Sequence, residues 1–154
     1  MKRLYLMRHG HAPTPAEAGV KSDALRPLSD KGRLDARRMA EEIGRRGGLP
    51  SLVLHSPLIR AVQTGQAAAA ALKIEAAEFA ALDNTLPAHE VFAALQKRAA
   101  GAEEILAVGH QPQIGELAAS LVDRIFEIYP AGLVAVEWAP EPRLLWALNV
   151  DELG

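Results

Sequence analysis

The chain has 154 residues, and its 17 Lys and Arg residues nearly balance its 19 Asp and Glu residues, for a formal net charge of −2. It contains no cysteine, which excludes disulfide scaffolds, thiolate metal sites and cysteine nucleophiles. The near-neutral charge indicates neither nucleic-acid nor membrane binding, and we find no secretory signal and no apolar run of the ~20 residues that a membrane span needs. We therefore expect a cytoplasmic protein with a single domain over residues 1–154.

Short apolar runs alternate with longer Ala-rich segments along the chain, and they predict strands and helices respectively. The expected strands are Leu4–Met7, Leu52–Leu54, a weaker Ile74–Phe79, Ile105–Val108, Leu133–Trp138 and Leu144–Val150. The expected helices are Asp30–Arg46, Pro57–Leu72, Pro87–Ala99 and Ile114–Val122. Strands that alternate with helices favour a single-domain α/β fold, in which a mostly parallel sheet carries helices on both faces.

Two serines are placed to begin helices. Ser29 precedes the helix at Asp30, and Ser56 precedes Pro57, so we predict Ser56 as the N-cap and Pro57 as the first helical residue. Residues 13–28 contain three prolines and scattered polar residues, and we expect them to form a loop that covers part of the molecule.

Guanidinium and imidazole groups follow three of the predicted strands. Arg8 and His9 follow the first strand, Arg60 lies shortly after the second, and His110 follows the fourth. Ligands of open α/β sheets bind outside the carboxyl ends of the strands. Buried cations are costly without a compensating anion, and the planar fork of arginine suits phosphate. These groups therefore predict an anionic substrate that contains phosphate.

Four short motifs occur in order between residues 6 and 110. They are Leu6-Met7-Arg8-His9-Gly10, Leu28-Ser29-Asp30-Lys31-Gly32, Ser56-Pro57-Leu58-Ile59-Arg60-Ala61-Val62-Gln63-Thr64 and Val108-Gly109-His110. Together, in this strand and helix context, they resemble the motifs of the histidine phosphatase superfamily, whose fold is called phosphoglycerate mutase-like. The short chain and the segment Leu25–Ser29 resemble most the SixA-type phosphohistidine phosphatases.

The resemblance implies a cofactor-independent and metal-independent phosphatase. His9 would be the nucleophile, forming a phosphohistidine that water hydrolyses. Three further catalytic residues would bind and stabilise the phosphoryl oxygens: Arg8, Arg60 and His110. Gly10 would let the backbone approach the phosphate, and Arg26 would be a third basic contact.

The two histidines need opposite protonation states in this scheme. His9 must be neutral to attack, whereas His110 is most useful when it is protonated. We expect the cations of Arg8 and Arg60 to lower the pKa of His9, and a bound phosphate to raise the pKa of His110.

The general acid is not defined by any motif. Many relatives place a carboxylate after the third strand, and here Asp83 and Glu90 are the candidates. A phosphorylated imidazole is a better leaving group than an alkoxide and needs less proton assistance. We therefore favour phosphohistidine on a protein as the substrate.

Three alternatives remain open. The protein could hydrolyse a small phosphate ester with the same fold, or bind phosphate without catalysis. It could also be a metal-dependent hydrolase, because the spacing of His9 and His11 is also a metal-ligand pattern, with His110 and Asp83 as further ligands. A mutase is disfavoured because the chain lacks long insertions that would enclose a sugar or glycerate phosphate.

Overall fold

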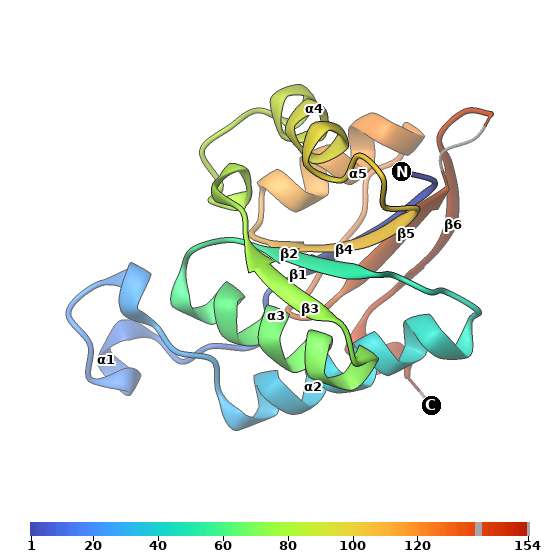
Figure 1. The fold of residues 1–154 in the computed structure, drawn as a ribbon. Helices are drawn as coiled ribbons and strands as arrows, with labels where there is room; N and C mark the ends of the chain where they lie inside the picture. The colour runs from blue at the N-terminus through green and yellow to red at the C-terminus, as the bar shows by residue number, and fades with distance from the viewer. Residues whose placement is uncertain (138–139, 154) are drawn as a thin grey trace.

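A six-stranded sheet lies between two layers of helices in the computed structural model, which describes residues 1–137 and 140–153 (Figure 1). The strands are β1 (Arg3–Arg8), β2 (Leu52–His55), β3 (Glu75–Glu78), β4 (Glu104–Gly109), β5 (Leu133–Glu137) and β6 (Arg143–Leu148). The α-helices are α1 (Pro15–Ala18), α2 (Asp30–Arg45), α3 (Ile59–Leu72), α4 (Ala88–Arg98) and α5 (Gln113–Val122). Short 3₁₀ turns are η1 (Asp23–Leu25), η2 (Ala80–Leu82) and η3 (Val150–Glu152).

The strand order is β3-β2-β4-β1-β5-β6. The first four strands in this order run parallel, while β5 pairs antiparallel with both β1 and β6. The ladder continues beyond two strand ends, because the His9 N–H donates to the Gly109 carbonyl at 2.9 Å and the Ser56 N–H donates to the Val108 carbonyl at 3.0 Å. Parallel pairing therefore brings the residues that follow β1, β2 and β4 to one edge of the sheet.

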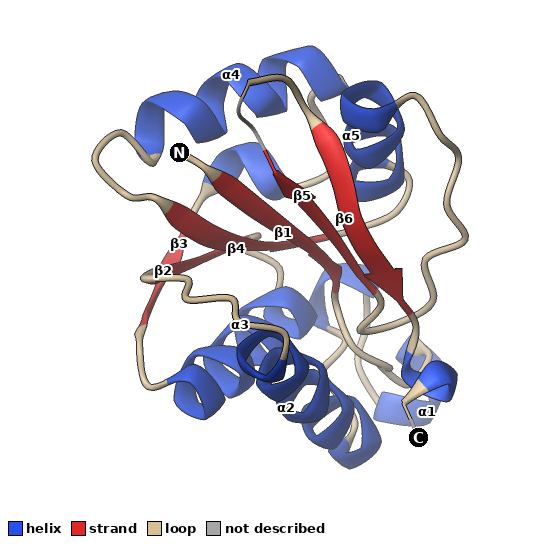
Figure 2. Ribbon diagram, turned by 90° about the vertical axis from the view of Figure 1, so that its right-hand side faces the viewer, coloured by secondary structure: helices blue, strands red, loops and turns tan. Residues whose placement is uncertain are grey.

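Both faces of the sheet are covered, as Figure 2 shows. Alternate side chains of a strand point to opposite faces. Leu4 and Leu6 of β1 accordingly pack in the core layer that contains α4 and α5. Tyr5 and Met7 pack in the layer that contains α2 and α3. Burial on both sides explains why the sequence of β1 is a continuous apolar run. The predicted α/β fold with a mostly parallel sheet is confirmed.

The start of α3 differs from the sequence prediction. The helix begins at Ile59 with Leu58 as its N-cap, so the prediction of Ser56 as N-cap and Pro57 as first helical residue is wrong. The hydroxyl of Ser56 instead accepts a hydrogen bond from the Leu58 N–H at 3.2 Å and contacts His110 Nε2 at 2.7 Å. The contact of Ser56 with His110 at the sheet edge thus takes the place of helix capping.

The segment 13–28 holds more structure than the loop we predicted. It contains α1, which begins with a reciprocal capping box between Thr14 and Glu17, and then η1. The Thr-x-x-Glu spacing was readable in the sequence. The other elements match within a few residues, except that Trp138 of the predicted fifth strand lies outside the described residues. The described residues include no helix long and apolar enough to cross a membrane.

Candidate active site

Three motif side chains meet at the carboxyl edge of the parallel strands. Arg60 Nε lies 3.3 Å from His9 Nε2, with the nitrogen of the guanidinium as the donor. The ring centroids of His9 and His110 are 5.2 Å apart. All three residues are buried, at 7%, 8% and 2% relative exposure for Arg60, His9 and His110. The sequence-predicted nucleophile, one of its arginines and the second histidine are therefore brought together.

The ring of His9 is oriented by its own loop. Its Nδ1 lies 2.8 Å from the Gly10 carbonyl, which can only accept, so Nδ1 carries the proton and Nε2 presents its lone pair. Burial lowers the pKa of His9 to about 3, against the opposing effect of the Gly10 carbonyl. The charges of His110, Arg60 and Arg8 lower this pKa further. The predicted direction is confirmed, but burial rather than the arginines is the main cause.

His110 is also uncharged at neutral pH. Burial, followed by the charge of Arg60, lowers its pKa to about 4, although Asp23 and Asp83 oppose the shift. The Ser56 hydroxyl lies 2.7 Å from Nε2 and already accepts a bond from a backbone N–H, so it can donate its own proton to Nε2. Nδ1 of His110 is then the protonated nitrogen, and it is buried without a hydrogen-bond partner among the described residues. That N–H can donate to a phosphoryl oxygen even without a positive charge.

Arg8 is half-buried at the end of β1. Its Nη1 donates to the Ile128 carbonyl at 3.0 Å, and its Nε is buried with no partner among the described residues. Burial lowers the pKa of Arg8, and the nearby charge of Arg26 adds to this. A buried donor on a cation calls for an anion, which is consistent with the predicted phosphate contact.

Arg60 is occupied on three sides. Besides the bond to His9, its Nη1 donates to the Asp23 carbonyl and its Nη2 donates to Asp23 Oδ2, both at 3.0 Å. The Asp23 side chain is 64% exposed. Hydrogen bonding from Arg26, together with the charge of Arg60, lowers the pKa of this carboxyl, so it is ionised at neutral pH. A carboxylate thus pairs with the arginine that we expect to bind phosphate.

Sequence reasoning missed Asp23. The signal was its spacing, since it lies three residues before Arg26 and just ahead of the segment Leu25–Ser29 that resembles the SixA-type enzymes. Arg26 donates to Asp23 Oδ1 at 2.9 Å and to the Pro13 and Ala12 carbonyls at 2.8 and 3.0 Å. Arg26 therefore lies beside the Arg60–Asp23 pair, and it links the segment 13–28 to the loop that follows β1. Its phosphate contact stays a prediction.

The remaining motif residues hold the loops in place. The Gly10 N–H donates to Thr64 Oγ1 at 3.0 Å, and the Leu28 N–H donates to Gln63 Oε1 at 2.7 Å. A Cβ on Gly10 would lie 2.8 Å from the Gly32 carbonyl oxygen, so glycine is required for close packing against the start of α2. The approach of the Gly10 backbone to phosphate stays a prediction.

Neither candidate general acid is placed as a free acid. Asp83 Oδ1 accepts from both the backbone N–H and the hydroxyl of Thr85, at 3.0 and 2.5 Å, and its charge reaches His110. Glu90 is exposed in the first turn of α4. Among the described residues there is also no group of three or more His, Asp or Glu residues that could hold a metal ion.

The arrangement can carry out phosphoryl transfer. A neutral imidazole nitrogen faces an arginine, and a second arginine and a second histidine each present a buried nitrogen with no partner among the described residues. Such donors stabilise the charge that develops on phosphoryl oxygens while a nucleophile attacks phosphorus.

Residues 4–125 match the family model of the histidine phosphatase superfamily (branch 1). The chain therefore belongs to the histidine phosphatase superfamily, and the resemblance indicated by its motifs is confirmed. An uncharacterized protein of Picosynechococcus sp. is 34% identical to it over 120 residues, which are 77% of this chain and 72% of that protein.

Solved structures share the fold over its whole length. The protein histidine phosphatase SixA, complexed with tungstate, is similar with a TM-score of 0.86 and 25% identity, covering 99% of both chains. A phosphoserine phosphatase mutant from Entamoeba histolytica, in complex with phosphoserine, has a TM-score of 0.75 at 15% identity and covers 100% of both chains. The second likeness concerns the fold alone. Family and fold together support a phosphatase.

Asp23→Asn tests whether the Asp23 carboxylate competes with phosphate for Arg60. Removing the charge should strengthen the binding of inorganic phosphate by up to about fivefold, the size of an exposed ion pair. Arg60→Ala should weaken it by at least about tenfold, since hydrogen bonds to charged groups are strong. Calorimetric titration measures both, with Asp30→Asn at the exposed start of α2 as the matched control. Weaker phosphate binding by Asp23→Asn would mean that Asp23 orients Arg60 rather than competes with its ligand.

The neutral state of His110 predicts a dependence of stability on pH. Its folded pKa is about 4 and its unfolded pKa is near 6.5, so between these values unfolding takes up a proton at this residue. The free energy of unfolding should therefore fall as the pH falls, by up to about 1.4 kcal/mol per pH unit from His110. The free energy of unfolding, measured with urea at several pH values between 4.5 and 6.5, should depend less steeply on pH in His110→Gln than in the wild type. An equal slope would contradict the buried neutral state, and His89→Gln, at an exposed position, is the control.

Proposed function

We propose that this protein is a phosphohistidine phosphatase that removes the phosphoryl group from a histidine on another protein, through a covalent intermediate on His9. The observation that carries the proposal is the orientation of His9. Its Nδ1–H donates to the Gly10 carbonyl, so Nε2 carries the lone pair, and the pKa of the ring is too low for protonation at neutral pH. Nε2 accepts a hydrogen bond from Arg60 Nε at 3.3 Å, and this donor must move to the phosphoryl group before the lone pair attacks. The nucleophile therefore needs no separate base.

In the first step, Nε2 of His9 bonds to phosphorus and the phosphorus–nitrogen bond of the substrate breaks. The substrate imidazole leaves with the bonding electron pair, and it is a neutral product when its other ring nitrogen is protonated. The phosphorylated ring of His9 is then cationic, and the Gly10 carbonyl that accepts its Nδ1–H stabilises it. Arg8, Arg60 and His110 act on the phosphoryl oxygens.

In the second step, water bonds to phosphorus and the bond to His9 Nε2 breaks. The ring recovers its lone pair and becomes neutral again, while both protons of the water stay on the released dihydrogen phosphate. Neither step requires the enzyme to donate a proton to the leaving group. This supports phosphohistidine over an alkyl ester, because Asp83 is engaged by Thr85 and Asp23 is held ionised.

A small-molecule phosphomonoesterase is the second candidate. It is favoured by one observation: the likeness in fold to a phosphoserine phosphatase that binds phosphoserine itself. The proposed substrate is thus a phosphorylated protein or a small phosphate ester. We propose that the reaction takes place in the cytoplasm and uses no metal ion or other cofactor.

Acid-labile phosphate on His9 is the expected signature of the mechanism. Turnover quenched in base and analysed by intact mass should show one added phosphoryl group, which mapping places on His9 and which acid removes. His9→Ala should lose at least about 10³-fold in kcat/KM, since the nucleophile is gone. His11→Asn is the control and should stay near wild type, with activity that survives excess chelator. Loss of activity in His11→Asn or on chelation would favour the metal-dependent hydrolase instead.

Parallel assays on different substrates test the substrate class. We expect kcat/KM for a protein that carries phosphohistidine to exceed that for phosphoserine and 3-phosphoglycerate by at least about tenfold, because those alkyl esters need a proton on the leaving oxygen. A greater kcat/KM for one of the small esters would replace the proposal with the phosphomonoesterase.

A further inference from the structure

The residue that holds Arg8 belongs to an irregular segment, residues 124–132, between α5 and β5. The Ile128 carbonyl accepts from Arg8 Nη1 at 3.0 Å. The same segment is bonded to the main chain of Arg8, since the Ala131 N–H donates to the Arg8 carbonyl and the Gly132 carbonyl accepts from the Arg8 N–H. The position of Ile128 therefore determines where the guanidinium lies.

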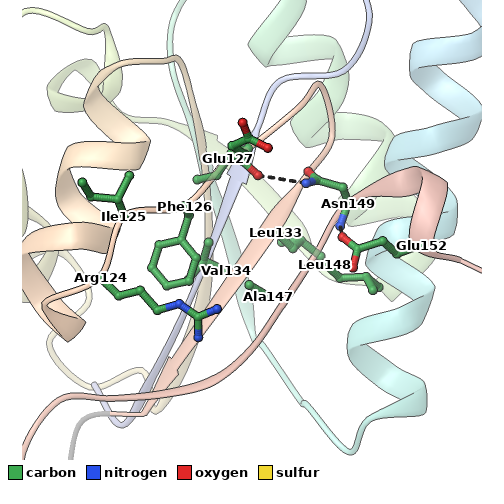
Figure 3. Close-up of a pocket in the computed structure, with 11 residues that line it drawn as sticks. Arg124, Ile125, Phe126, Glu127, Leu133, Val134, Ala147, Leu148, Asn149 and Glu152 are labelled. Carbon is green, nitrogen blue, oxygen red and sulfur yellow. Dashed lines mark hydrogen bonds between the residues drawn. The ribbon is translucent and has the colours of Figure 1, made fainter.

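Packing fixes only part of this segment. Ile125 is 90% exposed and Tyr129 is 49% exposed, whereas Ile128 is buried in the core layer with α4 and α5. A cavity of about 270 Å³ lies between the segment and β6 (Figure 3). The segment is anchored by the buried side chains of Ile128 and Ala131 and by the partly buried Phe126, but none of these contacts orients the Ile128 carbonyl directly.

Asn149, at the end of β6, supplies the missing support. Its Nδ2 donates to the Glu127 carbonyl at 2.8 Å, as Figure 3 shows, and its Oδ1 accepts from the Tyr129 N–H at 3.0 Å. These two peptide groups lie on either side of Ile128. Asn149 is itself held in place, because its backbone N–H donates to Glu152 Oε1 at 2.8 Å in the first turn of η3.

Gly132 provides the space for this contact. A Cβ at Gly132 would lie 2.3 Å from Asn149 Oδ1, closer than two such atoms can approach. A glycine at the start of β5 is thus matched to an asparagine at the end of β6. The pair brings the two ends together where the segment turns back toward Arg8.

We propose that Asn149 is a positioning residue for phosphoryl transfer. By bracketing Ile128, it fixes the carbonyl that receives Arg8 Nη1 and so keeps the buried Arg8 Nε available for a phosphoryl oxygen. The inference rests on the proposed function in one respect, namely that Arg8 contacts the phosphoryl group. It does not depend on which phosphorylated substrate the protein accepts.

A double-mutant cycle between Asn149 and Arg8 tests the proposal. Asn149→Ala should lower kcat/KM for para-nitrophenyl phosphate, and the affinity for inorganic phosphate, by at least about fivefold. In the Arg8→Ala background the same substitution should cost less than about twofold, because the residue it positions is gone. Equal losses in the two backgrounds would show that Asn149 acts on the fold in general, and the proposal would be overturned.

Two further variants keep the test decisive. Asn149→Asp retains the size and the acceptor for Tyr129 but loses the donor to Glu127, so it should fold and show part of the loss. Tyr5→Phe is the control, since it removes a 2.6 Å hydrogen bond to Glu104 at the opposite end of the sheet and should leave phosphate affinity unchanged. Wild-type kinetics and phosphate affinity in both Asn149 variants would refute the proposal. Phosphate affinity is measured without turnover, so failure of catalysis in the wild type would count against the proposed function alone.

Discussion

Burial of four basic side chains at one sheet edge is the constraint on which the rest of the site depends. Cations are expensive to remove from water, and the protein meets this cost in two ways. Both histidines are neutral, because burial holds their pKa values at about 3 and about 4. The arginines keep their charge and find oxygen partners, Arg8 at the Ile128 carbonyl and Arg60 at Asp23. The site therefore tolerates the burial of these groups and keeps donors that an anion can use.

The same burial explains why His9, the proposed nucleophile, is neutral. A protonated His9 could not attack, and a neutral one could adopt either tautomer. The Gly10 carbonyl selects the tautomer, and burial beside Arg60 removes the competing proton. Ser56, which follows the neighbouring strand β2, selects the tautomer of His110 by donating its hydroxyl proton to Nε2. Parallel pairing of β1, β4 and β2 is what brings these partners within reach.

The fold, and the meeting of His9, Arg60 and His110 at one sheet edge, could be predicted from the sequence because their signals are local. The continuous apolar run before Arg8 marks a strand buried on both faces, and four motifs in order mark its family. The start of α3 could not be predicted, since the capping preference of Ser56 competes with a contact to His110, 54 residues away. Asp23 was missed for a similar reason. Its spacing to Arg26 indicates a local ion pair, but nothing near it in sequence shows that the chain folds back onto Arg60. The capping box of α1, by contrast, was present in the sequence and overlooked.

The residues that the motifs identify and the residues that we propose to position them lie in different parts of the chain. The family match covers residues 4–125 and contains His9, Arg8, Arg60 and His110. The atoms that we propose to orient Arg8 lie beyond it. The backbone carbonyl of Ile128, which any residue type could supply, accepts from Arg8, and the side-chain amide of Asn149 binds the peptide groups on either side of Ile128. A backbone carbonyl cannot be recognised in a sequence pattern. Asn149, which binds the peptide groups beside that carbonyl, and Gly132, which makes room for Asn149, can be recognised. Relatives that keep the motif arginine can therefore differ in how firmly it is held, which provides a physical route to different phosphate affinities from the same reacting groups.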